Sequence, residues 1–600
     1  MFDVLVIGGG HAGCEAACAA ARRGARVALL TFRADDLGQM SCNPSIGGVG
    51  KGHLVREVDA MGGIMAMAAD RAAIHRRMLN ASKGSAVRGP RVQADRRLYR
   101  GAVADLVRSA GVTIVVGEVV GLLLARGEAV GVALSDGSTL GSRAVVLTTG
   151  TFLGATMFRG EERWTGGRMG GRASTRHCSQ VRELGLASGR LKTGTPPRID
   201  GRTIDWSRTT PQPSDPEPWT MALAPNPLPR AQLACAVTRT NERSHDVIRA
   251  GLSRSPLFSG AIEGRGPRYC PSIEDKVARF GDRDGHQIFL EPEGLDDFLV
   301  YPNGISTSLP VDVQQELVRS IGGLEQAEIV QPGYAVEYEY ADARSLDPAL
   351  QHRQVTGLYL AGQINGTTGY EEASAQGLVA GLNAAAQALG LDEARFDRGT
   401  SYIGVMIDDL TLHGTNEPYR MLTARSEYRL HLRADNAVSR LGPMALSLGA
   451  LSADQAERVR DYLDRKAAAQ SALSVTAVGR ELGIDDCARR TLSEWARRGN
   501  LVESIRLRLP DHAASGEALD DAVYAPYLER VRLELAARAR DQGLAIPPGF
   551  SFGDVPGLSS EMRERLESSG PADLDQASRV PGVTPAALSA LHFALARAAA

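Results

Sequence analysis

An apolar run, a cluster of glycines and a second apolar run follow one another at the start of the chain, in an order that predicts a βαβ unit. Residues 3–7 read as a buried parallel strand, residues 15–23 as a helix and residues 25–30 as a second strand. Between the first strand and the helix, residues 8–13 match the pattern G-x-G-x-x-G. Glycines in that position let a pyrophosphate approach the backbone amides at the start of the helix. The predicted dinucleotide-binding residues are Gly8, Gly9, Gly10, His11, Ala12 and Gly13.

The composition is that of a globular protein with more than one core. The chain has 600 residues, of which 43 % are hydrophobic and 23 % charged, and this length predicts about four domains. The net charge of −2 provides no overall positive field, so any contact with nucleic acid must use a local patch. Seven cysteines, an odd and small number for this length, favour a reducing compartment over a disulfide framework. Because no signal-peptide pattern is present and no apolar run reaches the roughly 18 residues of a membrane span, we expect a cytoplasmic protein with no membrane contact.

Strand and helix patterns divide the rest of the chain. Residues 112–148 contain short apolar runs separated by turn residues, which predict a small meander that returns to the main sheet. Seven prolines between residues 211 and 229 exclude a helix or a central strand, and indicate a linker or a loop that enters an inserted domain. Residues 357–362 read as another strand of the main sheet, and the pattern is mostly helical from residue 401. Near the end, Thr584 and Pro585 have the residue types of an N-cap and a first helical position.

Two cysteines stand immediately before expected helix starts, Cys42 ahead of residues 43–48 and Cys270 ahead of residues 271–276. The free amides and the dipole of a helix N-terminus favour an anion, so a thiol there ionises more readily. Pro271 fits the first turn of the second of these helices. A thiolate beside a cofactor attacks an electrophile or forms a disulfide, and a free cysteine is otherwise a small buried hydrophobe. The two motifs leave these roles open.

The other cysteines and the histidines predict no chemistry. Cys14 and Cys18 lie four residues apart and share one face of the first helix, where we expect them to pack against the sheet. Cys178, Cys235 and Cys487 have no partner in the sequence and are expected to be structural. Neither the eleven histidines nor the cysteines show the spacing of a metal site.

Two later segments resemble parts of the glutathione-reductase-type fold that contact FAD. Residues 145–150 resemble its strand and Thr-Gly turn. Residues 357–369 resemble its glycine-rich turn before a helix whose N-terminus faces the isoalloxazine ring. Together with the glycine turn of residues 8–13, three segments in the expected order favour FAD over a nicotinamide cofactor in this site.

Long motifs closely resemble the MnmG (GidA) family of FAD-dependent tRNA uridine 5-carboxymethylaminomethyl modification enzymes. The resemblance extends over the whole chain, including its helical end. The motifs that carry it are residues 8–15, 41–44, 80–84, 189–198, 266–276, 361–372, 425–430 and 581–585.

The resemblance implies an α/β fold class, with a glutathione-reductase-type FAD-binding (Rossmann-like) domain, an inserted α/β domain and an all-helical C-terminal domain. We expect the FAD-binding domain in two parts, residues 1–200 and 345–400, on either side of an inserted NAD or substrate domain at 201–344. A helical domain for tRNA and partner binding would follow at 401–545, and a small helical subdomain at 546–600.

The resemblance also implies a reaction and its partners. The family adds an aminomethyl or carboxymethylaminomethyl group at C5 of the wobble uridine of certain tRNAs, together with the GTPase MnmE. FAD is bound tightly, NADH reduces it, and a methylenetetrahydrofolate supplies the one-carbon unit. The family protein is a homodimer that joins an MnmE dimer in a heterotetramer.

Carried over onto this sequence, the resemblance names further cofactor residues. Val120, Ser174 and Gln363 match flavin contacts, and residues 266–280 match a segment assigned to NAD. Within that segment the candidate cofactor residues are Gly266, Tyr269, Pro271, Glu274, Lys276 and Phe280.

In this reaction Cys42 and Cys270 are the candidate catalytic residues. Uridine C5 is a poor nucleophile, but a thiolate that adds to C6 turns C5 into an enolate carbon, which attacks an iminium-like one-carbon donor. Loss of the C5 proton then expels the thiolate. Which cysteine attacks, and whether the other transfers protons or forms a transient disulfide, stays open at this point.

The predicted RNA contacts are Arg425, Arg429 and Arg433. With Arg420 they recur every four or five residues, a spacing that would place them along one helix face with tyrosines interleaved. Phosphate contacts combined with stacking commonly hold single-stranded RNA. The alternative is an ordinary solvated charged face.

Three other functions remain open on the sequence. A folate- and FAD-dependent tRNA uridine C5-methyltransferase would be shorter, and would lack the roughly 200 residues that follow residue 401. A flavin-coupled thiol–disulfide oxidoreductase would favour a C-x-x-C pair, which this chain does not contain, unless Cys42 and Cys270 meet in space. The third is a flavin-stabilised scaffold for a GTPase or RNA.

Overall fold

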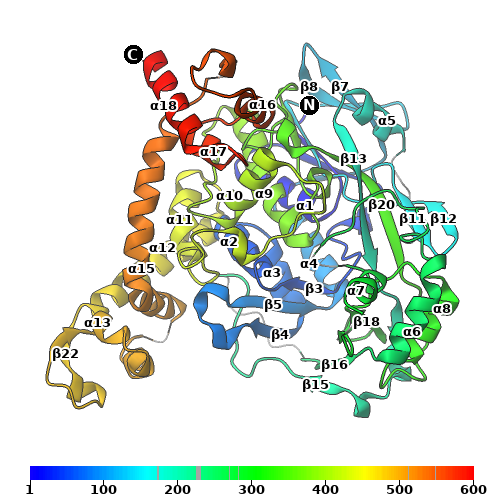
Figure 1. The fold of residues 1–600 in the computed structure, drawn as a ribbon, viewed down its shortest axis with the longest axis horizontal. Helices are drawn as coiled ribbons and strands as arrows, with labels where there is room; N and C mark the ends of the chain where they lie inside the picture. Colours follow the sequence, from blue (N-terminus) through cyan, green and yellow to red (C-terminus); the bar gives the residue numbers. More distant parts are fainter. Residues whose placement is uncertain are drawn as a thin grey trace.

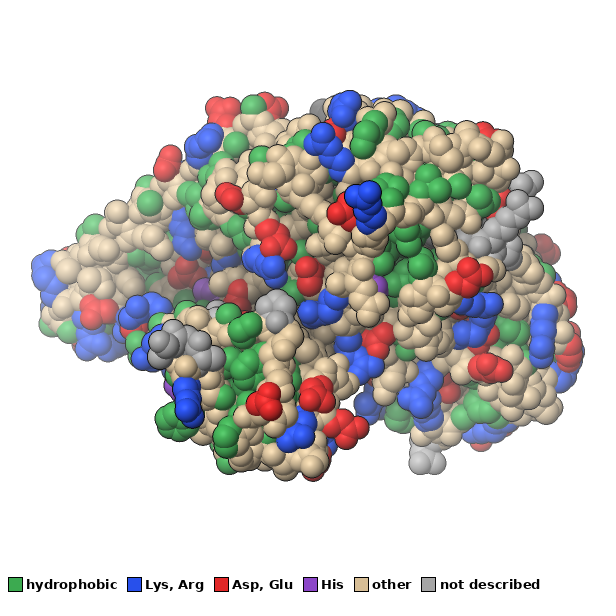
Figure 2. Space-filling model, turned by 90° about the horizontal axis from the view of Figure 1, so that it is seen from above, with side chains coloured by type: hydrophobic (Ala, Val, Ile, Leu, Met, Phe, Trp, Pro, Cys, Tyr) green, Lys and Arg blue, Asp and Glu red, His purple; other side chains and the backbone are tan. Residues whose placement is uncertain are grey.

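The computed structural model describes residues 1–171, 175–223, 231–268, 271–281, 283–510, 512–547 and 549–599. Two α/β lobes lie side by side, and a helical extension projects from the first of them (Figure 1). Basic and acidic side chains are interspersed over the face shown in Figure 2, in keeping with the small net charge. Among the described residues, no helix is both long enough and apolar enough to cross a membrane.

A five-stranded parallel sheet forms the centre of the first lobe, in the order β21-β10-β1-β2-β6. Its strands are β1 (Val4–Ile7), β2 (Val27–Thr31), β6 (Thr113–Val116), β10 (Ala144–Leu147) and β21 (Leu358–Leu360). All except β6 are buried at every position, as apolar strands covered on both faces should be. The strands predicted at residues 3–7, 25–30 and 357–362 are confirmed.

The predicted meander is also confirmed. Its three antiparallel strands are β7 (Val119–Ala125), β8 (Glu128–Leu134) and β9 (Thr139–Gly141). The chain leaves the main sheet after β6 and re-enters it at β10.

Two helices pack closely against each other beside this sheet, α1 (His11–Arg22) and α9 (Tyr370–Leu389). The close approach depends on Gly377 and Gly381 of α9, where an added Cβ would lie 2.1 and 2.2 Å from backbone oxygens of α1. Cys14 and Cys18 are buried in this core as predicted. Helix α1 begins four residues earlier than expected, because Gly10 already ends the turn that follows β1.

A three-stranded antiparallel sheet, β3-β5-β4, extends the first lobe toward the second. The elements of this region are β3 (Ser45–Gly47), α2 (Lys51–Ala60), α3 (Met65–Ala72), β4 (Ala73–Leu79), β5 (Gly89–Ala94) and α4 (Arg96–Ser109).

The proline-rich segment is fixed to this region up to residue 223. Its first part is β15 (Thr210–Gln212), an edge strand of the second lobe, which agrees with the exclusion of a central strand. Further on, the Asp70 carboxylate accepts hydrogen bonds from the Met221 and Ala222 amides, both at 2.8 Å. Residues 221 and 222 of this segment are therefore hydrogen-bonded to the first lobe. Residues 224–230 lie outside the described residues.

The second lobe contains two sheets, in the orders β12-β11-β20-β13 and β15-β16-β17-β18-β14-β19. Their strands are β11 (Thr156–Arg159), β12 (Glu162–Thr165), β13 (Ala187–Thr195), β14 (Arg198–Asp200), β16 (Cys235–Arg239), β17 (Gln287–Pro292), β18 (Leu299–Asn303), β19 (Ile329–Gln331) and β20 (Tyr334–Ala341). The helices are α5 (Thr175–Glu183), α6 (Glu242–Gly251), α7 (Ile273–Arg279) and α8 (Val311–Arg319). Because β11 and β13 pair with β20, the boundary predicted at residue 200 falls inside a structural unit.

The helical part of the chain follows residue 400, and its first helices pack into the core of the first lobe before the later ones project from it. Its helices are α10 (Tyr402–Asp408), α11 (Ala437–Ser447), α12 (Ala453–Leu473), α13 (Leu492–Ala496), α14 (Val502–Arg506), α15 (Ala513–Gln542), α16 (Ser560–Ser569), α17 (Leu574–Arg579) and α18 (Pro585–Ala599). The long helix α15 connects a small lobe around α13 with the C-terminal bundle of α16, α17 and α18 (Figure 1). Pro585 begins α18, as predicted. The region is not entirely helical, because β22 (Thr476–Val478) and β23 (Arg489–Thr491) form a hairpin.

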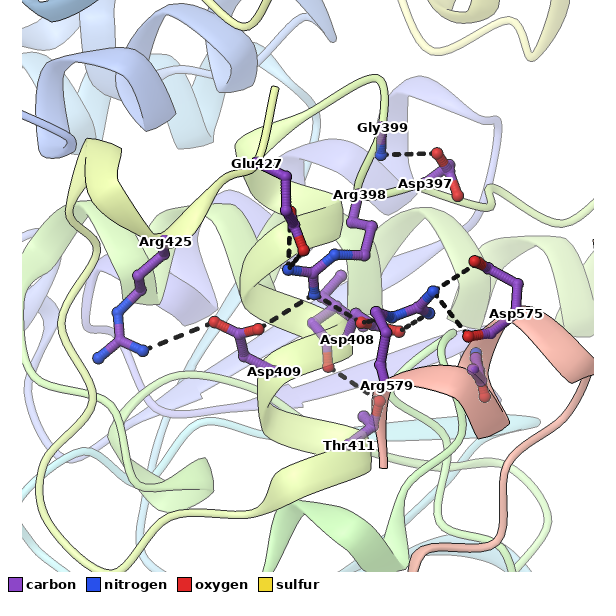
Figure 3. A network of polar contacts seen from close by, with 12 residues as sticks. Asp397, Arg398, Gly399, Asp408, Asp409, Thr411, Arg425, Glu427, Asp575 and Arg579 are labelled. Atoms are coloured by element: carbon purple, nitrogen blue, oxygen red, sulfur yellow. Dashed lines mark hydrogen bonds and ion pairs between the residues drawn. The ribbon is translucent and has the colours of Figure 1, made fainter. Parts of the chain in front are cut away.

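Ion pairs join the C-terminal bundle to the last residue of α10 (Figure 3). Arg579 of α17 binds the Asp408 carboxylate at 2.8 Å, and Arg398 contacts the same carboxylate at 2.6 Å. Arg398 also contacts Asp409 at 3.1 Å, and Asp409 lies 3.6 Å from the Arg425 guanidinium. We call these five residues the Asp408 network. Charges that share partners in a partly buried setting are worth more than isolated surface pairs, so the bundle is held firmly.

Candidate cofactor and thiol site

The glycine turn between β1 and α1 has the geometry that a phosphate needs. Gly8 has a φ of +113°, and an added Cβ would lie 2.3 Å from the Thr148 backbone oxygen. A Cβ on Gly13 would lie 1.8 Å from the Gly8 oxygen, so only glycine closes the turn there. By contrast, a Cβ on Gly10 meets no atom within 4 Å, because this residue faces open space. No side chain caps α1, which leaves its first amides available for an anion.

A cavity of about 340 Å³ begins at this turn and continues between the two lobes. The second lobe contributes Thr193, Tyr301 and Tyr334 to its wall, among other residues. The predicted site residues that line it are Gly8, Gly9, Gly10, His11, Ala12, Gln363 and Cys42. Gly13 is not in the wall, and neither is Val120, although its neighbour Val119 is.

His11 is packed between aromatic rings beside the cavity. Its ring stacks on Tyr370 with 4.3 Å between centroids and lies 5.7 Å from Tyr99. Burial lowers the pKa of His11 to about 4, so the imidazole is neutral near pH 7. His11 can therefore line a cofactor pocket as an aromatic wall without adding charge.

A buried lysine joins the first turn of α9 to α2. The Lys51 ammonium contacts Glu371 at 2.7 Å and Glu372 at 2.9 Å, and all three side chains are largely buried. Burial opposes the charge of Lys51, but the two carboxylates raise the pKa of Lys51 above its usual value. Burial also favours the protonated form of Glu371, but Lys51 and the Gly47 amide hold the pKa of Glu371 below its usual value. Lys51 and Glu371 line the cavity, so this cluster places charged groups in its wall.

Cys42 lies in the wall of the cavity, half-buried between the lobes. Its backbone amide donates to the Tyr370 hydroxyl at 2.7 Å, and its sulfur lies 3.1 Å from the Tyr301 hydroxyl. The prediction that Cys42 precedes a helix is wrong, because β3 follows it and α2 begins only at Lys51. The environment of this sulfur is therefore set by side chains from both lobes and not by a helix N-terminus.

Several predicted residues lie outside the described residues or away from the cavity. Ser174, Tyr269 and Cys270 belong to the parts of the chain that the structure does not describe. Pro271 precedes Ser272, the N-cap of α7, so it does not lie in the first turn of this helix as predicted. Gly266 packs over the Lys192 side chain, next to Pro267, which does line the cavity.

The predicted residues of α7 and its end make structural contacts. The buried Glu274 carboxylate accepts hydrogen bonds from the Thr307 hydroxyl and the Ser308 amide, at 3.0 and 2.9 Å. Lys276 donates to the Gly304 oxygen at 2.8 Å. Phe280 is 49 % exposed. None of these three residues lines the cavity in the described part of the protein.

The arginines predicted to bind RNA do not share a helix face. Residues 414–436 have no α-helix, so their spacing does not put them in register. Arg433 is 0 % exposed and binds Asp435 and Asp521, which contradicts a direct RNA contact. Arg425 stacks over the Tyr419 ring at 4.0 Å from its centroid, and Arg429 is exposed.

Sequence reasoning missed two residues that surround Cys42. Arg198 is buried, contacts Glu293 at 2.9 Å and donates to the Cys42 backbone oxygen at 2.9 Å. Tyr301 is buried in β18 and lies under the Arg198 guanidinium. Arg198 stands in one of the long motifs, residues 189–198, and its position there was the available signal. Tyr301 stands in an ordinary strand pattern with no such signal.

The fold and this cavity define a dinucleotide-binding α/β protein with a thiol in the cavity wall. A family model described as "Glucose inhibited division protein A" matches residues 3–392, and one described as "tRNA modifying enzyme MnmG/GidA C-terminal helical bundle" matches residues 534–600. The chain belongs to the GidA (MnmG) family.

Similar proteins match almost the whole chain. A protein of Zymomonas mobilis, described as "tRNA uridine 5-carboxymethylaminomethyl modification enzyme MnmG", is 54 % identical over 98 % of this chain and 97 % of its own length. GidA of Aquifex aeolicus, solved in two crystal forms, is 41 and 42 % identical, with TM-scores of 0.91 and 0.92. Each alignment covers 99 % of this chain, and 98 and 100 % of the two Aquifex chains.

Within the described residues, no cluster of His, Cys, Asp and Glu has the arrangement of a metal site.

Proposed function

We propose that this chain is a flavoenzyme that modifies C5 of the wobble uridine in tRNA, adding an aminomethyl or carboxymethylaminomethyl group. The observation that carries the proposal is the Cys42 sulfur in the wall of the cavity that begins at the glycine turn. The 54 % identity with a relative named for this modification supports it.

We propose FAD as the resident cofactor. Gly8 to Ala12 would hold its pyrophosphate, because the backbone at Gly10 is open and the first amides of α1 carry no side-chain cap. Gln363 in the cavity wall would be a further contact. Val120, next to the wall residue Val119, and Ser174, which lies outside the described residues, are proposed from the family resemblance. FAD supplies hydride or one-carbon carrier chemistry when bound. The proposal extends to NADH as the reductant, with residues 266–280 as its binding segment.

We propose that Cys42 acts as the nucleophile that activates the uridine. Its thiolate would add to C6, so that C5 gains the electron density to attack a folate-derived carbon. Loss of the C5 proton would then restore the C5–C6 double bond and release the sulfur. Cys270 is the second proposed catalytic residue.

The wobble base must leave the anticodon stack to reach the cavity.

We propose the GTPase MnmE as the partner and a homodimer as the unit that joins it. Support comes from the bundle of α16, α17 and α18, which matches the model for the family's own C-terminal bundle. Methylenetetrahydrofolate is the proposed carbon donor.

The proposal is tested by mass spectrometry of tRNA nucleosides from cells that lack this protein. Loss of the modified wobble uridine, restored by the wild type but not by Cys42→Ala, is the expected result, and Cys487→Ala is the matched control because that cysteine is exposed. A loss of 5-methyluridine instead would favour the methyltransferase. Unchanged nucleosides with an NADH-dependent change in free thiols would favour the oxidoreductase.

We expect Arg429→Glu to weaken tRNA binding several-fold without loss of flavin, because Arg429 is exposed in the part of the chain predicted to contact RNA. The slope of log K against log salt should fall by about one, as for one lost phosphate contact. Filter binding at several salt concentrations measures both values. Arg126→Glu, with the same charge change at the exposed turn between β7 and β8, should bind tRNA like the wild type. If both variants weakened tRNA binding equally, the effect would come from the net charge of the protein and not from a contact at Arg429.

A further inference from the structure

Resting on the proposed role of Cys42, we propose that Tyr301 is a further catalytic residue, whose phenol donates a hydrogen bond to the Cys42 thiolate and stabilises it. The Tyr301 oxygen lies 3.1 Å from the Cys42 sulfur, and both residues line the cavity. Tyr301 comes from β18 of the second lobe, whereas Cys42 precedes β3 of the first. The contact therefore exists only while the two lobes are together.

The direction of this hydrogen bond follows from the two contacts of the sulfur. The neutral thiol can donate to the Gly194 backbone oxygen, which lies 3.9 Å away, while it accepts from Tyr301. A thiolate has no hydrogen to donate, so it can only accept. On ionisation the contact with Gly194 is lost and the one with Tyr301 becomes charge-assisted, which makes it stronger. A hydrogen bond that strengthens on ionisation favours the ionised form.

Arg198 is the positioning residue for this pair. Its guanidinium carbon lies 4.8 Å from the centroid of the Tyr301 ring. A cation over the ring draws electron density from the phenol oxygen, and so strengthens the phenol as a donor. Arg198 is itself fixed by Glu293, and it donates to the Cys42 backbone oxygen at 2.9 Å. One buried guanidinium thus orients both members of the pair.

The other groups around Cys42 come from three further elements. Tyr370 at the start of α9 accepts a hydrogen bond from the Cys42 amide, and its pKa is raised by burial and then by the Cys42 charge. Tyr334 of β20 lies in the same wall, and burial raises its pKa. Arg96 of α4 donates to the Met40 oxygen, two residues from Cys42. Among these described neighbours, only Tyr301 has a donor within hydrogen-bond distance of the sulfur.

The test measures ionisation of Cys42 in the flavin-loaded protein, without tRNA. Iodoacetamide reacts with thiolates, so the rate of Cys42 alkylation against pH, read by peptide mass spectrometry, reports the thiolate fraction. In Tyr301→Phe we expect this profile to move up by about one pH unit, which makes the reaction about tenfold slower at neutral pH. Exposed Cys487 in the same sample is the internal reference and should not change. Tyr527→Phe is the matched variant, because Tyr527 is exposed on α15 and does not line the cavity, and its Cys42 profile should equal that of the wild type.

A second variant gives an effect of opposite sign. A monofluorotyrosine at position 301 is a stronger donor that keeps its proton at neutral pH, so Cys42 should alkylate faster at neutral pH than in the wild type. An unchanged profile in both variants of Tyr301, or the same shift in Tyr527→Phe, would overturn the proposal. These outcomes are independent of the tRNA assay. If Cys42→Ala restored the modified nucleoside, the proposed function of Cys42 would fail even with the alkylation shifts present.

Discussion

A Gly10→Val variant is expected to fold normally but to purify without flavin. The added Cβ meets no protein atom within 4 Å, and the side chain enters the space that the pyrophosphate of the proposed cofactor requires. Displacing the phosphate from two backbone amides removes two charge-assisted hydrogen bonds, or about 3–6 kcal/mol, and weakens binding by about 100-fold or more. Flavin absorbance of the purified protein and titration of the apoprotein with FAD measure the loss.

Gly13 and Gly101 give the comparison that separates binding from folding. Gly13→Val should lose both flavin and stability, because its Cβ would lie 1.8 Å from the Gly8 oxygen. Gly101→Ala, in the exposed part of α4 with open space around it, should keep flavin and gain about 0.5–1 kcal/mol of helix stability. Full flavin affinity in Gly10→Val would show that the pyrophosphate does not lie on this turn.

A Lys51→Met variant is expected to lose about 3–5 kcal/mol of stability at pH 7 to 8, since two buried carboxylates would be left without their cation. Lys51 contacts both Glu371 and Glu372, and each carboxylate is at most 3 % exposed. Urea unfolding followed by the fluorescence of released flavin measures the change in the lobe that holds them. Arg97→Met is the matched control, because Arg97 and Asp296 form an exposed pair, which contributes less than about 1 kcal/mol.

The pH dependence of this variant has a definite sign. In the wild type, the pKa of Glu371 is held below its usual value, so its stabilisation is full above pH ~4.5 and is lost as the pH falls through the folded pKa. Without Lys51, only backbone hydrogen bonds such as that of the Gly47 amide oppose the effect of burial, so the pKa of Glu371 rises and the variant loses stability as the pH rises. The gap between the two proteins should therefore widen between about pH 5 and pH 8. A constant gap over this range would mean that lost packing, not charge, causes the change.

The strands and the cofactor turn were predictable because they depend on local sequence. Apolar runs at residues 3–7 and 357–362 can be buried only in a covered parallel sheet, and the glycines at 8 and 13 are required by contacts with nearby backbone. The prediction that the arginines share one helix face was wrong, because it depended on a helix that local sequence did not establish. A spacing of four or five residues implies one face only if a helix forms, and residues 414–436 have no α-helix.

The surroundings of Cys42 could not be predicted because they are assembled from distant parts of the chain. Tyr301 and Tyr370 follow Cys42 by more than 250 residues. Tyr301 stands in an ordinary strand pattern, and the motif of residues 361–372 that contains Tyr370 does not indicate a contact with Cys42. The helix expected after Cys42 was wrong because residues 45–47 pair with β5, a contact that local pattern does not reveal. Arg433 looked like an RNA contact for the same reason, since its partner Asp521 lies in α15.

The Asp408 network connects the last helices of the chain to the cavity through a series of side-chain contacts. Tyr419 donates to Asp409 at 2.8 Å, and the Arg425 side chain donates to the backbone oxygen of Arg420, which lines the cavity. A displacement of α17 would act first on the ion pair of Arg579 with Asp408. The next residue, Asp409, would be affected after it. A connected series of side-chain contacts thus links α17 to Arg420 in the cavity wall.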